Sequence, residues 1–244
     1  MRLILENKLI PVLSFLLGFA ICISTAGMTA CYVALTILVL CCANFKSRFK
    51  QALQHKFVLS SMIFYLIFVF ACLWSEGTPK DCWRMLSKID GYILAPLLLI
   101  ACQTNQSGKL LLRGFIIGAV LSAGLSIGSY LANYHILYGI QDNTWVVFHG
   151  HILHNAFLAV AGSFLILLIL DKSYTRIYRI IFQIAYLTCL LDTIFVVVGR
   201  TGQVMFLAMS AFALIYHFKI KGIWVLIGLA IIVTPLVYFS PAVK

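Results

Sequence analysis

The stretch F-V-V-V-G-R-T-G-Q-V-M-F, residues 195–206, decides how the chain is organised. Arg200 stands between two glycines, and apolar segments long enough to cross a bilayer lie on both sides of it. A charge among such segments is costly unless it lies at a span end or in a polar cavity. We therefore expect a tight helical hairpin at this point, and Arg200 is the first candidate functional residue.

The composition indicates a membrane protein. The chain has 244 residues, of which 63% are hydrophobic and 10% are charged, and its mean hydropathy is +1.04. Soluble domains carry about 25% charged residues. The predicted fold class is all-α, a polytopic bundle of membrane-spanning helices. Spans of about 20 residues each use up nearly the whole chain, so residues 1–244 are expected to form a single transmembrane domain.

Nine apolar segments predict about nine transmembrane helices, because lipid offers no hydrogen-bond partner to an unpaired backbone. A tight turn at Gly27 is expected between the first two. The predicted spans are Leu9–Ala26, Met28–Ala43, Phe57–Trp74, Asp90–Gln103, Leu110–Tyr134, Ile152–Leu170, Ile180–Val198, Gln203–Phe218 and Ile223–Phe239.

The Lys and Arg residues set the expected orientation. With a cytoplasmic amino terminus, 13 of the 18 Lys and Arg residues fall on the inside, as the positive-inside rule requires. The net charge of +11 therefore reflects topology, and no nucleic-acid partner is expected. The sequence predicts a bacterial inner-membrane protein with a periplasmic carboxyl terminus. The basic residues placed outside are Lys80, Arg84, Lys88, Arg200 and Lys244.

The chemistry around Arg200 suits an anion. Gly199 and Gly202 permit unusual backbone conformations and leave amide groups free where a helix begins. A guanidinium group beside such amides can donate two parallel hydrogen bonds to a phosphate. Gly199, Arg200, Thr201 and Gly202 are therefore the candidate pyrophosphate-binding residues. An arginine that reaches lipid headgroups from the end of a span is the alternative.

Asp192 and a group of histidines are secondary candidates. Asp192 lies inside an apolar segment, so it must pair with a polar group, stay protonated or face a polar cavity. His149, His151 and His154 cluster where a loop meets the sixth span, and we expect them at the membrane interface with Asn155 as a helix cap. No acidic or cysteine residue lies close in sequence, so no metal is expected.

The loop before the fourth span carries another basic group. Lys80, Arg84 and Lys88 recur every four residues, so a short interfacial helix would present them on one face. That face could attract anionic lipid headgroups or a lipid-linked phosphate. The eight cysteines include no C-x-x-C pair, which argues against a zinc site or a redox motif.

The fifth span has small residues at every fourth position: Gly114, Gly118, Ser122 and Ser126. Such a row lets two helix backbones approach closely. We interpret it as a packing ridge, with Gly124 and Gly128 on a neighbouring row.

The carboxyl-terminal part resembles a known family. G-R-T-G at 199–202, the entry H-G-H-I-L-H-N-A-F-L-A at 149–159 and the basic turn D-K-S-Y-T-R-I-Y-R at 171–179 resemble the O-antigen ligase and polymerase superfamily. The resemblance is strongest from about Val147 to Lys244. Relatives usually continue with a large periplasmic loop and further spans, so we expect this chain to be the amino-terminal portion of a longer architecture.

The resemblance implies a glycosyltransferase of lipopolysaccharide biosynthesis. Such an enzyme transfers a glycan from undecaprenyl-pyrophosphate to a lipid A core sugar, and a polymerase uses a growing glycan as acceptor. Arg200 matches the family's arginine that binds the carrier pyrophosphate, and no cofactor or metal is implied. The family's histidine base lies in the missing loop, so no catalytic residue is assigned. A transporter of a lipid-linked glycan or anionic solute is the alternative from another class.

Overall fold

The computed structural model describes residues 8–41, 45–92, 95–102, 105–134, 145–197 and 200–219. Within these ranges the chain is helical and contains no strand, which confirms the predicted all-α class. The chain divides into two compact units. The described part of unit 1 is residues 8–17 and 29–112, and that of unit 2 is residues 18–28 and 113–219, each with the gaps given above.

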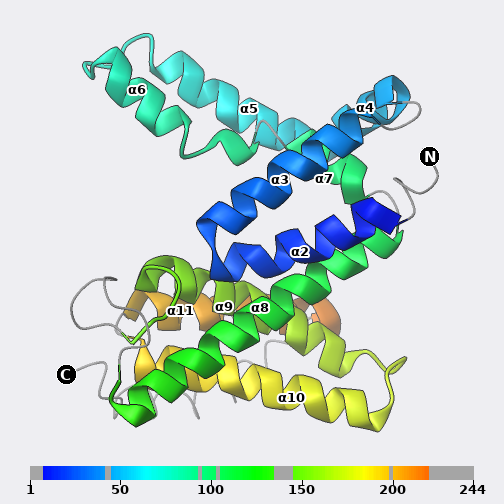
Figure 1. The fold of residues 1–244 in the computed structure, drawn as a ribbon, viewed down its shortest axis with the longest axis vertical. Helices are drawn as coiled ribbons and strands as arrows, with labels where there is room; N and C mark the ends of the chain where they lie inside the picture. Colours follow the sequence, from blue (N-terminus) through cyan, green and yellow to red (C-terminus); the bar gives the residue numbers. More distant parts are fainter. Residues whose placement is uncertain are drawn as a thin grey trace. The chain divides into compact units, whose positions relative to one another are not determined.

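Unit 1 holds the helices of the amino-terminal half (Figure 1). α5 contacts α4, α6, η2 and α7, and it ends shortly before an exposed loop that leads into α6. The elements wholly in unit 1 are α4 (Phe45–Leu53), α5 (Lys56–Ala71), α6 (Pro79–Leu86), η2 (Asp90–Tyr92) and α7 (Ala95–Cys102). α2 (Ile10–Ile23), α3 (Thr25–Leu40) and α8 (Asn105–Ala132) are shared between the units.

Unit 2 is organised around α9 (His151–Leu170), which packs against both α10 (Arg176–Leu191) and α11 (Arg200–Phe218). Gly162 allows this close approach: a Cβ atom added there would lie 2.8 Å from Cζ of Phe206. The Phe206 ring also contacts the Tyr186 ring of α10, at 5.6 Å between centroids. Further toward the carboxyl ends of α9 and α11, Ile166, Ala213 and Leu214 form a buried apolar cluster.

Among the described residues, four helices are long and apolar enough to cross a membrane: Gln106–Ala132, His151–Leu170, Arg176–Val196 and Arg200–Phe218. Thr25–Leu40 with Phe45–Leu53 would be a fifth if the two counted as one bent span. Ile10–Ile23 and Lys56–Ala71 are apolar but shorter. The expected nine spans are therefore not confirmed.

Two of the predicted spans need comment. The predicted fourth span, Asp90–Gln103, is divided into the 3-residue η2 and the 8-residue α7. Eight residues rise about 12 Å in an α-helix, far less than the bilayer core of about 30 Å. The predicted ninth span, Ile223–Phe239, lies outside the described residues.

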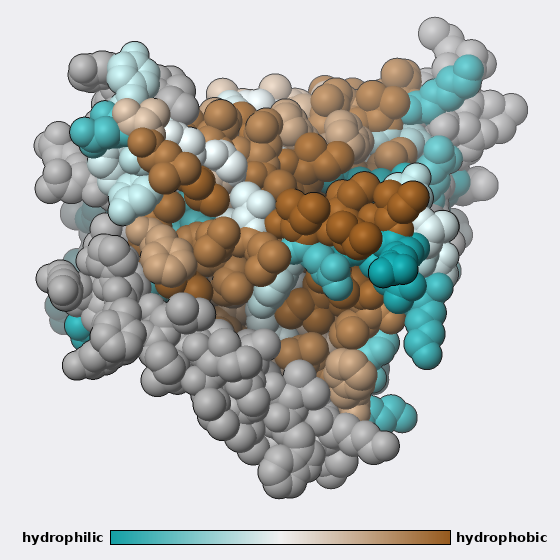
Figure 2. Space-filling model, turned by 90° about the horizontal axis from the view of Figure 1, so that it is seen from below, coloured by the Kyte–Doolittle hydropathy of each residue, from teal (hydrophilic) through white to brown (hydrophobic). Residues whose placement is uncertain are grey.

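The surface of these helices is apolar, as lipid contact requires. α10 exposes Ile180, Ile184, Leu187 and Leu191 along one side, at the spacing of a helix face. Figure 2 shows hydrophobic side chains over much of one face of the molecule. Such a surface would be unfavourable in water, so it supports a membrane environment.

α8 uses only one of its two predicted small-residue rows for close packing. A Cβ atom at Gly118 would lie 2.8 Å from the backbone oxygen of Phe19 and 3.2 Å from Cβ of Cys22, both on α2. At Gly124 and Gly128 an added Cβ atom would meet no atom within 4 Å. The row that contains Gly118 is therefore the packing ridge.

One predicted turn differs from the sequence interpretation in detail. α2 and α3 are separated at Ser24 rather than at Gly27, and the Ser24 hydroxyl accepts a hydrogen bond from the Gly27 amide at 3.1 Å. The serine therefore caps the new helix, as short hydroxyl side chains commonly do. At the other turn, α10 continues into the π-helix η3 (Asp192–Val196), and α11 begins at Arg200. The predicted tight turn between these helices includes residues 198 and 199, which lie outside the described residues.

Candidate functional site

Three buried polar side chains from three elements of unit 2 form a hydrogen-bonded row. His154 on α9 lies at its centre. Its Nε2 atom is 2.6 Å from Oδ2 of Asp192, the first residue of η3. Its Nδ1 atom is 3.2 Å from Oγ of Ser122 on α8. Both nitrogens of the imidazole ring are thus engaged by side chains from other elements.

The row is isolated from solvent and lipid. The exposed fractions are 0% for Asp192, 2% for His154 and 1% for Ser122. A lone carboxylate in such a place would be very costly, and a hydrogen-bonded partner reduces that cost. The pairing therefore explains how the apolar segment tolerates Asp192.

The two ring nitrogens of His154 take different roles. When the ring carries its hydrogen on Nε2, that nitrogen donates to the Asp192 carboxylate, and Nδ1 accepts the Ser122 hydroxyl hydrogen.

The next residue on α9 connects this row to the start of α11. Asn155 packs directly on Gly202, where an added Cβ atom would lie only 2.7 Å from Cβ of Asn155. Gln203 follows Gly202, and its Nε2 atom donates to the backbone oxygen of Ile194 in η3 at 3.4 Å. The first turn of α11 is therefore fixed against both α9 and η3.

Several buried oxygen atoms around this turn have no hydrogen-bond partner within the part of the chain that the structure describes. They are Oδ1 of Asp192, Oδ1 of Asn155 and Oε1 of Gln203. Asn155 and Gln203 are 3% and 4% exposed. Buried acceptors are normally satisfied, so this region is able to accept hydrogen bonds from a ligand or from water.

Arg200 lies beside this polar region and is exposed. It is the first residue of α11, where backbone amides have no partner within the helix and the helix dipole favours negative charge. Thr201 is exposed and Gly202 is buried, while Gly199 lies outside the described residues. An exposed cation, free amides and a fixed first turn together make a place that can bind an anionic oxygen.

The three candidate histidines do not come together. His149 is buried, and its ring contacts Phe157 at 5.4 Å between centroids. Burial lowers the pKa of His149, although a hydrogen bond to the backbone of Ile21 acts in the opposite direction. His151 begins α9, and no cluster that could hold a metal exists among the described residues.

One expectation for this segment is wrong. His154 is buried among the helices, and its position at the membrane interface stays a prediction. Asn155 does not cap α9, because Gly150 holds the N-cap position. Both residues instead turn toward neighbouring helices, and that orientation depends on how α9 packs.

The basic candidates Lys80, Arg84 and Lys88 belong to unit 1, and all three are exposed. The expected short helix is present as α6. Thr78 and Asp81 form a reciprocal capping box, with the Asp81 amide bonded to the Thr78 hydroxyl at 3.3 Å. Lys80 and Arg84 lie within α6, whereas Lys88 lies two residues beyond its end.

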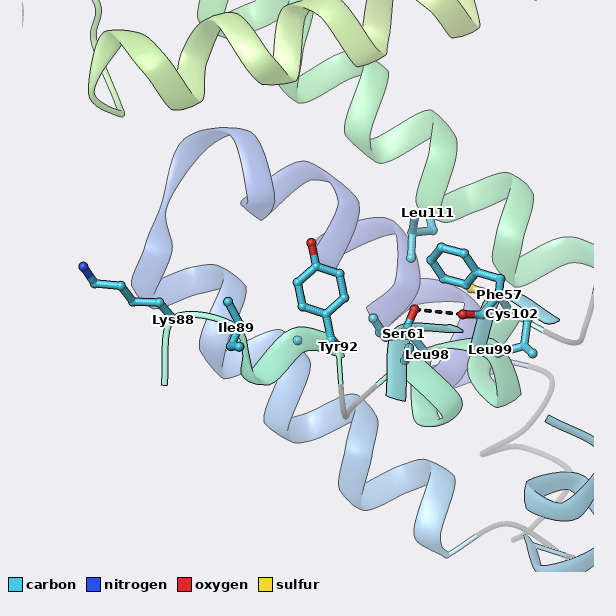
Figure 3. Close-up of a pocket in the computed structure, with 11 residues that line it drawn as sticks. Phe57, Ser61, Lys88, Ile89, Tyr92, Leu98, Leu99, Cys102 and Leu111 are labelled. Carbon is cyan, nitrogen blue, oxygen red and sulfur yellow. Dashed lines mark hydrogen bonds between the residues drawn. The ribbon is translucent and has the colours of Figure 1, made fainter. Parts of the chain in front are cut away.

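An apolar pocket of about 460 Å³ also lies in unit 1. Figure 3 shows the Lys88 chain extending away from the other lining residues, with the Tyr92 ring between it and Leu98 and Leu99. The lining also includes Ser61. Its hydroxyl donates a hydrogen bond to the backbone oxygen of Phe57 on the same helix. Lys88 is the one candidate binding residue in the lining of this pocket.

The sequence did not predict that Ser122 and Gln203 belong to this buried polar region. Ser122 was assigned to the packing ridge, yet it bonds His154. One feature of the sequence pointed to a polar role for Ser122: a second serine, Ser126, follows one turn later on the same face of the predicted helix.

Comparisons with known proteins found no match. No family model, curated protein or solved structure matches this chain. The functional proposal therefore depends on the residues and their geometry.

Proposed function

We propose that this protein is an O-antigen ligase-like glycosyltransferase of a bacterial inner membrane. In this proposal it transfers a glycan from undecaprenyl-pyrophosphate to a lipid A core sugar on the periplasmic face. The observation that supports it best is the position of Arg200, exposed at the start of an apolar helix and beside a buried polar region.

The chemistry of the transfer explains why an arginine at this position would matter. The acceptor hydroxyl oxygen bonds to the anomeric carbon while the bond from that carbon to the pyrophosphate oxygen breaks. The bonding electron pair leaves with the pyrophosphate, and the hydroxyl proton passes to a base. Arg200 and the amides of α11 would stabilise the negative charge that gathers on the departing group.

The transfer of a glycan to a growing chain, as in a polymerase, would use the same carrier and the same arginine. The two reactions differ only in the acceptor. Analysis of the product therefore decides between ligase and polymerase.

A transporter is the second candidate, and one structural feature favours it. α10 changes into the π-helix η3, where an ionisable pair is buried. π-helical turns are frequent at functional sites, and buried ionisable residues within spans often mark substrate or ion pathways. Such a protein would recognise the lipid-linked anion without breaking it.

A transfer assay separates these functions. The protein is reconstituted in liposomes with a glycan linked to undecaprenyl-pyrophosphate and a lipid A core acceptor. We expect release of undecaprenyl-pyrophosphate together with a glycan joined to the acceptor, both seen by mass spectrometry. Movement of intact donor between the bilayer leaflets, without release of the carrier, would instead identify a transporter and contradict the proposed enzyme.

A further inference from the structure

Two cysteines that the sequence places ten positions apart lie together at the exposed end of unit 1. Cys72 is the C-cap residue of α5, and Cys82 lies on α6. The two helices contact each other. Both thiols are partly exposed, and both residues line one small cavity, together with Trp83 and Leu86.

We propose that Cys72 and Cys82 form a disulfide bond that joins the end of α5 to α6. The proposal depends on the orientation in the proposed function, which puts this loop on the periplasmic face, where disulfides form and persist. No C-x-x-C motif signals this pair in the sequence. The fold brings the thiols together because the chain reverses direction between the two helices.

Two other cysteines provide a useful contrast. Cys22 and Cys189 in unit 2 are both buried among apolar helices. A thiol must reach an oxidant before it can be oxidised. Cys72 and Cys82, which lie outside the long apolar helices, meet this requirement, whereas Cys22 and Cys189 do not.

The reaction needs an oxidant, which would be the disulfide of a thiol–disulfide oxidoreductase. One cysteine thiolate attacks this disulfide and forms a mixed disulfide, and one sulfur of the oxidoreductase leaves as a thiolate. The second cysteine thiolate then attacks the mixed bond and releases the other sulfur. The two cysteines lose two electrons and two protons, and the oxidoreductase becomes a dithiol.

The bond would give α6 a fixed position. α6 is a short helix whose start is already held by the Thr78 and Asp81 capping box. A covalent link at Cys82 would attach its middle to α5. Lys80 and Arg84 would then be presented on a helix that cannot separate from the end of α5.

The test uses spheroplasts that contain the full-length protein. They are treated with a membrane-impermeant maleimide, with or without prior reduction by a phosphine, and the peptides are analysed by mass spectrometry. We expect a linked peptide that contains Cys72 and Cys82 before reduction, and labelling of both thiols only after it. In Cys72→Ser, Cys82 should be labelled without reduction, whereas the control Cys102→Ser should behave as the wild type does.

Two other results would each overturn the disulfide and can be told apart. Labelling of both wild-type thiols without reduction would show a periplasmic loop with free thiols. This would leave the proposed orientation and function intact. Labelling only by a membrane-permeant maleimide would place the loop in the cytoplasm and would also contradict the orientation on which the proposed function depends.

Discussion

Replacing Asp192 with alanine is expected to lower the free energy of unfolding by about 3–5 kcal/mol, the usual cost of removing one partner from a buried pair. The variant leaves His154 buried without the carboxylate 2.6 Å from its Nε2 atom. The ring would then lack a partner for one nitrogen in a region closed to solvent. Thermal and denaturant unfolding of the purified protein in detergent, followed by circular dichroism, measures the loss.

Two further variants show whether the pair itself is responsible. Asp192→Asn keeps an oxygen that can accept from His154, so it should cost less than Asp192→Ala. The double variant Asp192→Leu with His154→Leu removes both polar groups and should recover much of the stability, since buried ion pairs are often replaceable by apolar residues. Asp171→Ala, in the exposed loop after α9, is the control and should have little effect. A loss of less than about 1 kcal/mol in Asp192→Ala, the size of an ordinary substitution, would show that the pair does not stabilise unit 2.

Replacing Gly202 with valine is expected to lower the free energy of unfolding by about 1–3 kcal/mol, the range for overpacked sites, and to move the first turn of α11. A Cβ atom at this position would lie 2.7 Å from Cβ of Asn155. The Asn155 Cβ atom cannot rotate away because it is attached to the backbone of α9. One helix must shift, and the adjacent Arg200 would be displaced with the turn. The same unfolding measurement applies.

Gly124→Ala is the matched control for this prediction. An added Cβ atom there meets no atom within 4 Å, and alanine is favoured over glycine in a helix by about 1 kcal/mol. This variant should therefore be as stable as the wild type or more so. Adding Asn155→Gly to Gly202→Val should recover part of the loss because it removes the conflicting atoms. Equal stability of Gly202→Val and the wild type would mean that α9 and α11 do not approach as closely as described.

The features that the sequence predicted are those determined by local pattern. The long apolar segments of the second half became α8 to α11. The short helix at Lys80 and Arg84 was expected from their four-residue spacing. Each of these signals lies within about one helix length in the chain.

The features that sequence reasoning missed depend on contacts between distant segments. An acid inside a span predicts a polar partner, but the partner of Asp192 is His154, 38 positions away. Which side of α9 faces η3 is decided by packing, since α9 is apolar around most of its surface. For the same reason Asn155 resembled a helix cap in the sequence, whereas the fold uses it as a contact for Gly202.

The binding of a lipid pyrophosphate at Arg200 is the central claim, and equilibrium binding of farnesyl pyrophosphate to the purified protein tests it most directly. Arg176→Ala is the matched control, because Arg176 is also an exposed arginine that begins a helix. Loss of charged hydrogen bonds of about 1.5–3 kcal/mol corresponds to about 10–150-fold weaker binding by Arg200→Ala. We expect that loss, with Arg176→Ala unchanged and farnesyl monophosphate bound less tightly by the wild type. Equal affinity of the wild type, Arg200→Ala and Arg176→Ala for farnesyl pyrophosphate would contradict the claim.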